Sequence, residues 1–434
     1  MRTTPATLAA LALVLTPGAA PAEAPAVHAL VGARVVVAPG RVLPQATVVL
    51  RDGVITAVAA GLEPPADARI WKLDGKTIYP GLIDAWVPRA WPLEKAEELP
   101  QGAHRNPAVR TERDVVDRLR DDKSWQDLRE AGFTTALVVP GEGIFRGLGA
   151  VANLSDDPRA GVLRPRAVQA VAVRSGKDPS GYPRSLMGAV ALFRQTILDA
   201  RWHARAESAY RADPSQARPS YDASLSALEP AATGAMPIVF ETENVLDALR
   251  VAGLAEELDL RAWIVGSGEE YRRLAELRER PLPLVLPIAF PKRPDVDNLD
   301  DGTIGLDELR HWDQAPSNPA LLDQARVPFA LTSFRQEKPR EIWKHLARAI
   351  ERGLAPDRAL AALTQVPAEY LGISGRAGTV EAGKMANLVV VDGELLVESP
   401  KIEAVWIDGV HYAPAGAADK SKDEKKESAV EASR

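Results

Sequence analysis

The stretch KTIYPGLIDAWVP, residues 76–88, decides how the chain is divided. Before it, residues 28–80 consist of short β-branched runs separated by turns that contain glycine, a pattern typical of antiparallel strands. After it, apolar strand-like runs alternate with segments of helical periodicity. The stretch therefore marks the passage from a small β-rich region into a larger region of a different kind.

The β-rich pattern returns near the C-terminus. Four Asp-Gly pairs serve as hairpin signals in the two regions: residues 52–53, 74–75, 392–393 and 408–409. We expect residues 28–80 and 375–412 to form one small β-sandwich domain that is built from both ends of the chain.

The middle of the chain, residues 81–374, carries eight strand-like runs with helical patterns between most of them. The runs are 77–87, 134–139, 149–154, 167–173, 237–241, 261–265, 282–288 and 328–332. This α/β alternation predicts a (β/α)₈ TIM-like barrel, with an open parallel sheet as the alternative. One long helical segment from Ser185 to Ala212 departs from the regular pattern.

Composition excludes several kinds of function. The chain has 434 residues, no cysteine and a formal net charge of −6. Without cysteine there are no disulfides, no thiolate catalysis and no cysteine metal site. The charge gives no reason to expect nucleic acid as a partner. No stretch reaches the ~18 apolar residues that a membrane span requires, so we expect none.

Both ends of the chain predict segments outside the folded part. Residues 1–22 combine Arg2, a short apolar run and small residues up to Ala22, which is the pattern of a signal peptide cleaved after Ala22 or Ala24. The mature protein is therefore expected to be exported, either periplasmic or secreted. Residues 413–434 are charged and lack large apolar side chains, so they predict a disordered tail.

Two longer motifs resemble the amidohydrolase superfamily, with the imidazolonepropionase-like branch as the nearest match. They are LDGKTIYPGLIDAWV at residues 73–87 and the segment from GLAPDRALAAL to VVVDGEL at residues 353–395. The resemblance implies a barrel joined to a β-domain. It also implies hydrolysis of carbon–nitrogen bonds, other than peptide bonds, by water activated on zinc or another divalent metal.

The metal ligands that this resemblance implies are missing from the sequence. A His-x-His pair is expected at the end of the first barrel strand, where this chain has Trp86 and Pro88. The other ligand positions fall on Phe240, on Gly266 or Ser267, and on Ser333. An indole only donates a hydrogen bond, and a proline side chain has no donor atom for a metal. We therefore expect no metal cofactor.

The six histidines do not replace these ligands. They are His28, His104, His203, His311, His345 and His411. No two of them have the i, i+2 or i, i+4 spacing of a ligand pair, and we interpret them as solvated or hydrogen-bonded side chains. His104 and His311 are placed in loops, where they come closest to reaching the barrel mouth.

Strand ends at the barrel mouth supply the candidate site. Glu241 and Glu243 are one strand period apart and are candidate catalytic carboxylates together with Asp84. A structural alternative is that the two glutamates flank the start of the next helix. The candidate binding residues are Trp86, Arg174, Ser267, Ser333 and Arg335. The glycine-rich residues 138–155 predict a flexible loop over the mouth, with Phe145 and Arg146 at its tip.

These observations favour an exported protein of hydrolase fold that is metal-free and acts as a degenerate binding or interaction protein. Its expected partner is a small molecule or a peptide-like ligand, and the long helix suggests a lid or a homo-oligomer. The alternative is an active hydrolase of a cyclic amide or peptide-like substrate, through an unrecognised metal or carboxylate site. A third interpretation is a structural subunit, which would need an apolar external patch. In an inert barrel Trp86 should fill the space that a metal vacates.

Overall fold

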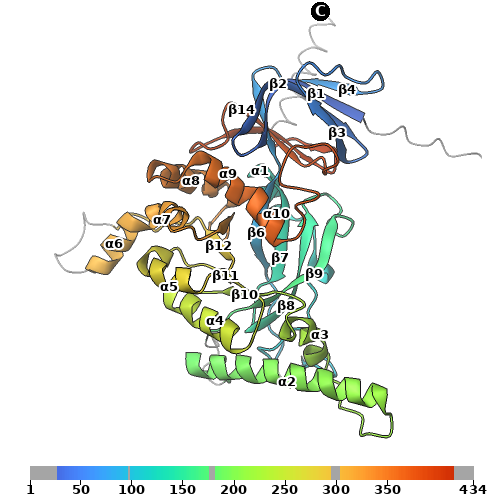
Figure 1. Ribbon diagram of the computed structural model, residues 1–434, viewed down its shortest axis with the longest axis vertical. Helices are drawn as coiled ribbons and strands as arrows, with labels where there is room; N and C mark the ends of the chain where they lie inside the picture. The colour runs from blue at the N-terminus through green and yellow to red at the C-terminus, as the bar shows by residue number, and fades with distance from the viewer. Residues whose placement is uncertain (1–26, 96–97, 175–180, 295–303, 415–434) are drawn as a thin grey trace, which may run out of the picture.

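The computed structural model describes residues 27–95, 98–174, 181–294 and 304–414, which form two eight-stranded sheets with helices around one of them (Figure 1). The predicted signal peptide lies outside the described residues. So does the predicted tail beyond residue 414, and the boundaries of the predicted domains stay predictions.

The first sheet is built from both ends of the chain. Its strands are β1 (Val27–Ala38), β2 (Arg41–Arg51), β3 (Val54–Ala59), β4 (Arg69–Lys72), β5 (Lys76–Pro80), β14 (Leu388–Asp392), β15 (Lys401–Ile407) and β16 (Val410–Tyr412). They follow the order β16-β15-β14-β5-β1-β2-β3, and β4 pairs with β1. The antiparallel pairing of β5 with β14 joins the two ends. These strands form one sheet, and the second layer of a sandwich stays a prediction.

Three of the four Asp-Gly pairs occur where antiparallel strands are joined. Asp52 and Asp408 both have a positive φ, near 50°, and each is followed by a glycine of positive φ, as a tight two-residue hairpin turn requires. The pair at residues 392–393 follows β14 and begins a longer connection to β15. The prediction was wrong for Asp74-Gly75, because β4 and β5 both run parallel to β1 and therefore form no hairpin.

The second sheet is a nearly closed barrel. Its strands are β6 (Leu82–Arg89), β7 (Phe133–Pro140), β8 (Phe145–Asn153), β9 (Val162–Val171), β10 (Ile238–Glu241), β11 (Ala262–Val265), β12 (Leu284–Pro287) and β13 (Phe329–Thr332). They are hydrogen-bonded in chain order from β6 to β13. The two end strands approach each other: the Thr332 hydroxyl on β13 donates to Asp84 on β6 and also lies 2.9 Å from the carbonyl oxygen of Trp86. The predicted eight-stranded barrel is confirmed at this level.

One strand departs from the (β/α)₈ pattern. β8 runs antiparallel to both β7 and β9, whereas the other neighbouring strands of the barrel are parallel. The links at residues 141–144 and 154–161 contain no helix. β7, β8 and β9 therefore form a meander inside an otherwise parallel barrel.

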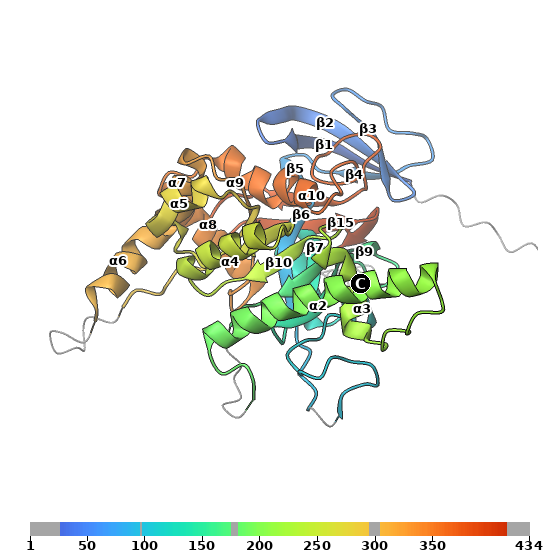
Figure 2. The same cartoon turned by 60° about the horizontal axis from the view of Figure 1, so that its bottom comes forward.

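Helices cover the outside of the barrel (Figures 1 and 2). They are α1 (Lys123–Glu130), α2 (Leu186–Ala212), α3 (Ala223–Ala232), α4 (Val245–Glu257), α5 (Leu274–Glu279), α6 (Leu306–Gln314), α7 (Asn318–Gln324), α8 (Ile342–Glu351), α9 (Pro356–Leu363) and α10 (Gln365–Tyr370). The long helix predicted from residue 185 is α2, whose N-terminus is capped by the Ser185 hydroxyl. It lies along one edge of the molecule in Figure 1 and faces the viewer in Figure 2.

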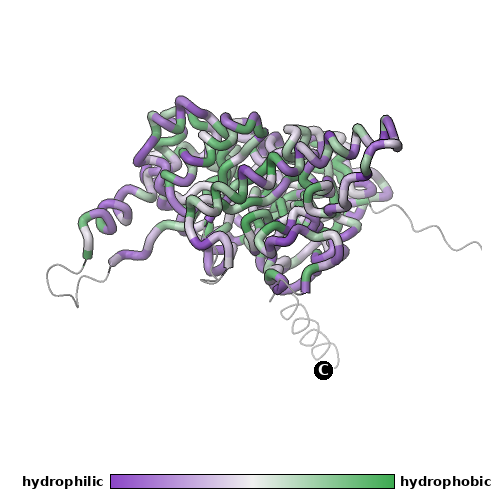
Figure 3. Tube along the Cα trace, turned by 90° about the horizontal axis from the view of Figure 1, so that it is seen from below, coloured by the Kyte–Doolittle hydropathy of each residue, from purple (hydrophilic) through white to green (hydrophobic). Residues whose placement is uncertain are grey.

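Alternate residues of the barrel strands face two different cores. Outward residues such as Phe240 pack against the helices, and the ring of Phe240 lies 5.2 Å from that of Phe193 on α2. Inward residues such as Val239, Trp86 and Trp263 form a separate apolar cluster with α10 and residues 371–385. In Figure 3 the hydrophobic trace gathers toward the middle of the molecule and the hydrophilic trace toward its outer loops. The lumen is therefore filled with apolar side chains.

Across the part of the chain that the structure describes, no helix combines the length and the apolar character needed to cross a membrane.

Candidate functional site at the barrel mouth

The candidate site lies where the parallel barrel strands end. β6, β10 and β13 bring Trp86, Glu241 and Thr332 to this end of the barrel. Because β8 is antiparallel, its first residues arrive at the same end, and they include Arg146. The mouth is thus formed by the C-terminal ends of the parallel strands and by the N-terminal end of the antiparallel strand β8.

Glu241 is the central carboxylate of the mouth. It accepts two hydrogen bonds from the guanidinium of Arg146, at 2.7 and 2.9 Å, and the two side chains are 8% and 1% exposed. Burial by itself would raise the pKa of Glu241, but the hydrogen bonds and charge of Arg146, with help from Arg174, hold this pKa below its ordinary value. Glu241 is therefore a carboxylate that stays ionised in the folded protein.

Trp86 fills the lumen directly beside this pair. Its side chain is fully buried in the inward apolar cluster, and its indole N–H donates to Oε2 of Glu241 at 3.3 Å. The same carboxylate oxygen takes the shorter of the two bonds from Arg146. The sequence interpretation expected Trp86 to fill the space of a metal if the barrel is inert, and that link to an inert barrel stays a prediction.

Asp84 forms a second buried cluster with the end of β13. Thr332 Oγ1 and Ser333 Oγ each donate to its carboxyl group at 2.5 Å, and the backbone N–H groups of Trp86 and Ser333 donate at 3.2 Å. Burial raises the pKa of Asp84 above its ordinary value, and these four hydrogen bonds only partly oppose that rise. The Asp84 carboxyl thus joins the two end strands of the barrel.

Arg335, which follows β13, links the ends of the neighbouring strands β10 and β11. Its guanidinium donates to the carbonyl oxygens of Thr242 at 2.7 Å and Ser267 at 3.0 Å, after β10 and β11. Its own φ of 72° lies in the left-handed region, which a residue other than glycine adopts at a cost of about 1–3 kcal/mol. The predicted binding residues Ser267 and Arg335 are therefore in contact through a backbone carbonyl.

Glu243 and Arg174 lie at the rim rather than inside. β10 ends at Glu241, so the strand alternation does not extend to Glu243, whose side chain is 61% exposed. Arg174 lies 3.6 Å from Glu241 and 3.5 Å from Glu243. The two glutamates thus share one arginine, while only Glu241 faces the lumen.

Sequence reasoning placed Arg146 wrongly. The glycine-rich residues 138–155 were expected to form a flexible loop, but residues 145–153 are β8, and Phe145 and Arg146 are both buried. The glycines serve close packing: a Cβ on Gly147 would lie 2.4 Å from the carbonyl oxygen of Arg113. The sequence did predict a strand at residues 149–154. Extending that predicted strand toward the N-terminus would have included Arg146.

The residues present do not fit a divalent metal. Phe240 faces outward, Trp86 and Pro88 offer no ligand atom, and both oxygens of Glu241 are bound to Arg146. Within residues 27–95, 98–174, 181–294 and 304–414, no three His, Asp or Glu side chains come together as a metal-binding group.

The histidines lie away from this cluster. His203 is buried on α2, and His28 and His411 pack against Trp406 in the first sheet. His311 was expected in a loop but belongs to α6, where it contacts the Tyr271 hydroxyl at 3.2 Å. His104 accepts a hydrogen bond from the backbone of Asn106 within its own loop.

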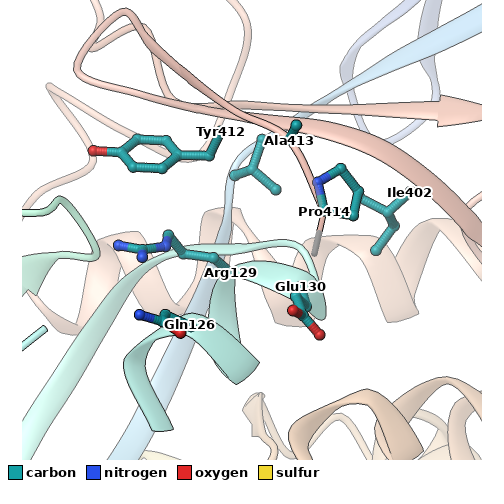
Figure 4. Close-up of a pocket in the computed structure, with 8 residues that line it drawn as sticks. Gln126, Arg129, Glu130, Ile402, Tyr412, Ala413 and Pro414 are labelled. Carbon is teal, nitrogen blue, oxygen red and sulfur yellow. The ribbon is translucent and has the colours of Figure 1, made fainter. Parts of the chain in front are cut away.

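Cavities of different size occur among the residues that the structure describes. Beside Glu241 there is a space of only about 10 Å³, toward Asp247 and Arg250 of α4. A cavity of about 400 Å³ lies between the β1–β2 turn and α10. Another, of about 180 Å³, lies between α1 and the C-terminal strands, where Arg129 and Tyr412 face each other (Figure 4). At the mouth, the described side chains around Glu241 leave only the small space toward α4.

Comparison with solved structures identifies the fold. The amidohydrolase from Thermotoga maritima MSB8 matches with a TM-score of 0.72 and 22% sequence identity, over 89% of this chain and 99% of that one. A putative prolidase from Bifidobacterium longum matches with a TM-score of 0.53 and 17% identity, over 92% and 98% of the two chains. The chain therefore has the fold of amidohydrolases.

Sequence comparison supports the same family for the C-terminal part. Residues 316–413 match the amidohydrolase family. Amidohydrolase tasK of Hapsidospora irregularis is 33% identical over 89 residues, which are 20% of this chain and 9% of that protein. The chain thus spans only a small part of this relative, and it carries an amidohydrolase family segment within a hydrolase fold.

Proposed function

We propose that this chain is an exported, divergent relative of the imidazolonepropionase-like amidohydrolases that has lost the metal site at its barrel mouth and acts by binding or interaction. Residues 1–22 would direct it to the periplasm or out of the cell. In this proposal the fold is kept and the family's hydrolysis is not.

One observation carries the proposal: the mouth is occupied by its own side chains. Trp86 fills the lumen, and Arg146 binds both oxygens of Glu241. A metal or substrate that reached this carboxylate would have to displace a buried guanidinium, and a buried charge without its partner is strongly unfavourable. Zinc also needs three or four N, S or O ligands, which the described residues of this mouth do not bring together.

The rim supports a small-molecule or peptide-like ligand. Arg174 is 31% exposed and Glu243 is 61% exposed, so one cation and one anion are available to solvent beside the closed lumen. Ser333 contributes a hydroxyl that is already bound to Asp84. A ligand that carries both an acidic and a basic or amide group would match this pair, as charge-assisted hydrogen bonds are the stronger ones.

The surface of α2 supports a homo-oligomer. Met187, Leu198 and Trp202 are 80%, 48% and 58% exposed on this helix. Their spacing of eleven and four residues puts Met187, Leu198 and Trp202 on one helix face. An exposed apolar stripe of this kind is typical of a contact surface.

A second candidate is an active hydrolase of a cyclic amide or peptide-like substrate that uses Asp84. The observation that favours it is the raised pKa of this buried carboxyl, next to the hydroxyls of Thr332 and Ser333. A carboxyl group with a raised pKa can serve as a general acid or base.

Metal content and hydrolysis, measured together, distinguish these proposals. The mature full chain would be incubated with zinc, manganese and iron, desalted and analysed by elemental mass spectrometry, then assayed on cyclic amides and dipeptides. The loss of the metal site predicts less than about a tenth of an equivalent of any metal, against the one or two that a bound site holds, and no turnover. About one equivalent of metal would overturn it. Turnover without metal that D84N abolishes would favour the second candidate instead.

A further inference from the structure

Arg146 is a buried cation in an unusual position. Only 1% of its side chain is exposed, and Glu241 is the carboxylate with which it forms an ion pair. Taking a guanidinium out of water is costly, and a bidentate carboxylate partner offsets that cost best. The pair is therefore self-neutralising, in the part of the barrel where a metal-dependent relative would concentrate positive charge.

We propose that the Arg146 guanidinium is the built-in cation of the barrel mouth, which takes the place of a metal beside Glu241 and thereby holds Trp86 in the lumen. This proposal rests on the proposed function, since it assumes a mouth without a metal site. It adds that Arg146 supplies the positive charge that a metal ion would otherwise supply beside Glu241.

The backbone around Arg146 is shaped to deliver this side chain. In the pairing of β8 with β9, Phe145 is opposite Val171 and Gly147 is opposite Ala170, so Arg146 is the extra residue of a β-bulge. Bulges redirect a side chain and are frequent beside functional sites. Gly147 has a φ of 127°, which glycine adopts far more readily than other residues. The antiparallel strand and its bulge thus aim the guanidinium into the mouth.

Glu241 acts as the bridge between Arg146 and Trp86. Its Oε2 accepts from both the guanidinium and the indole N–H, and its Oε1 accepts the second guanidinium bond. Without Arg146 this buried carboxylate would keep one neutral donor, the indole of Trp86. Arg146 therefore acts on Trp86 through Glu241, as a positioning residue.

The other charged groups near Glu241 do not replace Arg146. Arg174 is 3.6 Å away and partly exposed, and it also serves Glu243. On α4, Asp247 and Arg250 lie beside Glu241 but are bonded to each other. After β13, Arg335 donates to backbone carbonyls. A double-mutant cycle on Arg146 and Glu241 consequently isolates the pair.

The experiment is urea unfolding of the full chain and its variants R146M, E241Q, R146M/E241Q and R146K. R146M should lower the folding equilibrium constant about tenfold or more at pH 7.5, because each unit by which the pKa of Glu241 rises is worth a factor of about ten. R146M/E241Q should recover much of this loss, and R146K part of it. The matched control is R110M, which removes another buried guanidinium that hydrogen-bonds to Glu112. R110M should be additive with E241Q.

The pH dependence of stability distinguishes an electrostatic role of Arg146 from a role in packing, because a loss of packing alone would not depend on pH. In R146M, Glu241 has lost its cation, so protonation relieves it and the deficit relative to wild type should shrink between pH 7.5 and pH 5. R146M/E241Q should lack this recovery. Additive single effects, together with a deficit that does not change with pH, would overturn the proposal. If R146M does not fold, the stabilities of E241Q and of the double variant still test the proposal. A double variant that is as unstable as R146M would refute the coupling between Arg146 and Glu241.

Two outcomes separate this proposal from the proposed function. A metal-loaded wild-type chain would refute the proposed function, whatever the cycle gives. A metal-free chain without coupling between Arg146 and Glu241 would refute only the role of Arg146. Added chelator should leave the unfolding midpoint of the wild type unchanged, since the cation in question is covalently part of the chain.

Discussion

The two ends of the barrel carry buried polar networks of opposite character. At the mouth, charged side chains pair with each other, as in Arg146 and Glu241. At the other end, Asn153 and Asn387 join the barrel to the first sheet mainly through amide hydrogen bonds. One strand contributes to both networks, because β8 begins near Arg146 and ends at Asn153.

The junction network is the more complete of the two. Asn153 Nδ2 donates to both oxygens of Asp408, at 2.8 and 2.9 Å, and Asn387 Nδ2 donates to Asn153 Oδ1 at 3.0 Å. The backbone N–H of Asp408 donates to Asn387 Oδ1 at 2.8 Å. At the mouth, in contrast, Nε of Arg146 is buried and has no hydrogen-bond partner among the residues that the structure describes.

This difference separates fold from chemistry. Asn387 and Asp408 lie within residues 316–413, the segment that matches the amidohydrolase family, whereas the mouth replaces the ligand positions that the family resemblance implies. The choice of residues at a junction is constrained by the packing of two sheets, whereas the choice of residues at an active-site mouth is constrained by the reaction that the site performs. Function therefore has to be argued from the site rather than from the fold alone.

The largest expected effect tests the filled lumen. Trp86→Ala should destabilise the protein by about 3–5 kcal/mol, because it leaves a cavity in the inward cluster and removes the indole bond to Glu241. The measurement is the free energy of unfolding in urea. Leu246→Ala is the control, since Leu246 is 54% exposed on α4, away from the proposed α2 contact face, and should change this free energy by about 0.5 kcal/mol at most. A loss below about 1 kcal/mol for Trp86→Ala would mean that the mouth is not a packed core.

The second effect tests the junction. A Cβ on Gly81 would lie 2.2 Å from Thr134 Oγ1 and 2.9 Å from the carbonyl oxygen of Asn387. Gly81→Ala should therefore cost about 1–3 kcal/mol in the free energy of unfolding. Gly375→Ala is the control, because no atom lies within 4 Å of its added Cβ. Equal stability of the two variants would show that the junction yields easily, and the contrast with the mouth would fail.

The smallest effect concerns the surface of the junction. Hydrogen bonds from Thr379 and Arg41 lower the pKa of Glu381 to about 2. Because this pKa is below its unfolded value, the stabilisation is present above the ordinary pKa near 4.5 and is lost as the pH falls toward 2. Glu381→Gln should thus cost about 1 kcal/mol or less at pH 7, given its 40% exposure. Urea unfolding from pH 7 to pH 2.5 would measure this cost, and a deficit that grows on acidification would contradict the assignment.

Local patterns in the sequence predicted most of the fold. The eight barrel runs overlap β6–β13, although the first run, 77–87, also includes most of β5, and the long helical segment from Ser185 to Ala212 corresponds to α2. These features depend on periodicity within one element, which a single sequence contains. The direction of a strand depends on its neighbours instead, so the reversal of β8 was not predictable from its own residues.

The candidate site was predicted in part for the same reason. Asp84, Trp86 and Glu241 were found because parallel strands end at the mouth. Arg146 was missed because glycine-rich sequence reads as a loop, whereas the need for Gly147 comes from the distant carbonyl of Arg113. The partners of Asp84 follow from the approach of β13 to β6, which no local pattern encodes.

The meander of β7, β8 and β9 also has a consequence for the order of folding. Its strands are joined by the short links 141–144 and 154–161, so its contacts are local in sequence. The first sheet closes only when β5 pairs with β14, and the contact of Tyr79 with Leu395 spans 316 positions. Closing so long a loop carries a large entropic cost before its contacts form. We therefore expect the meander, with Arg146 already in its bulge, to form before the first sheet is complete.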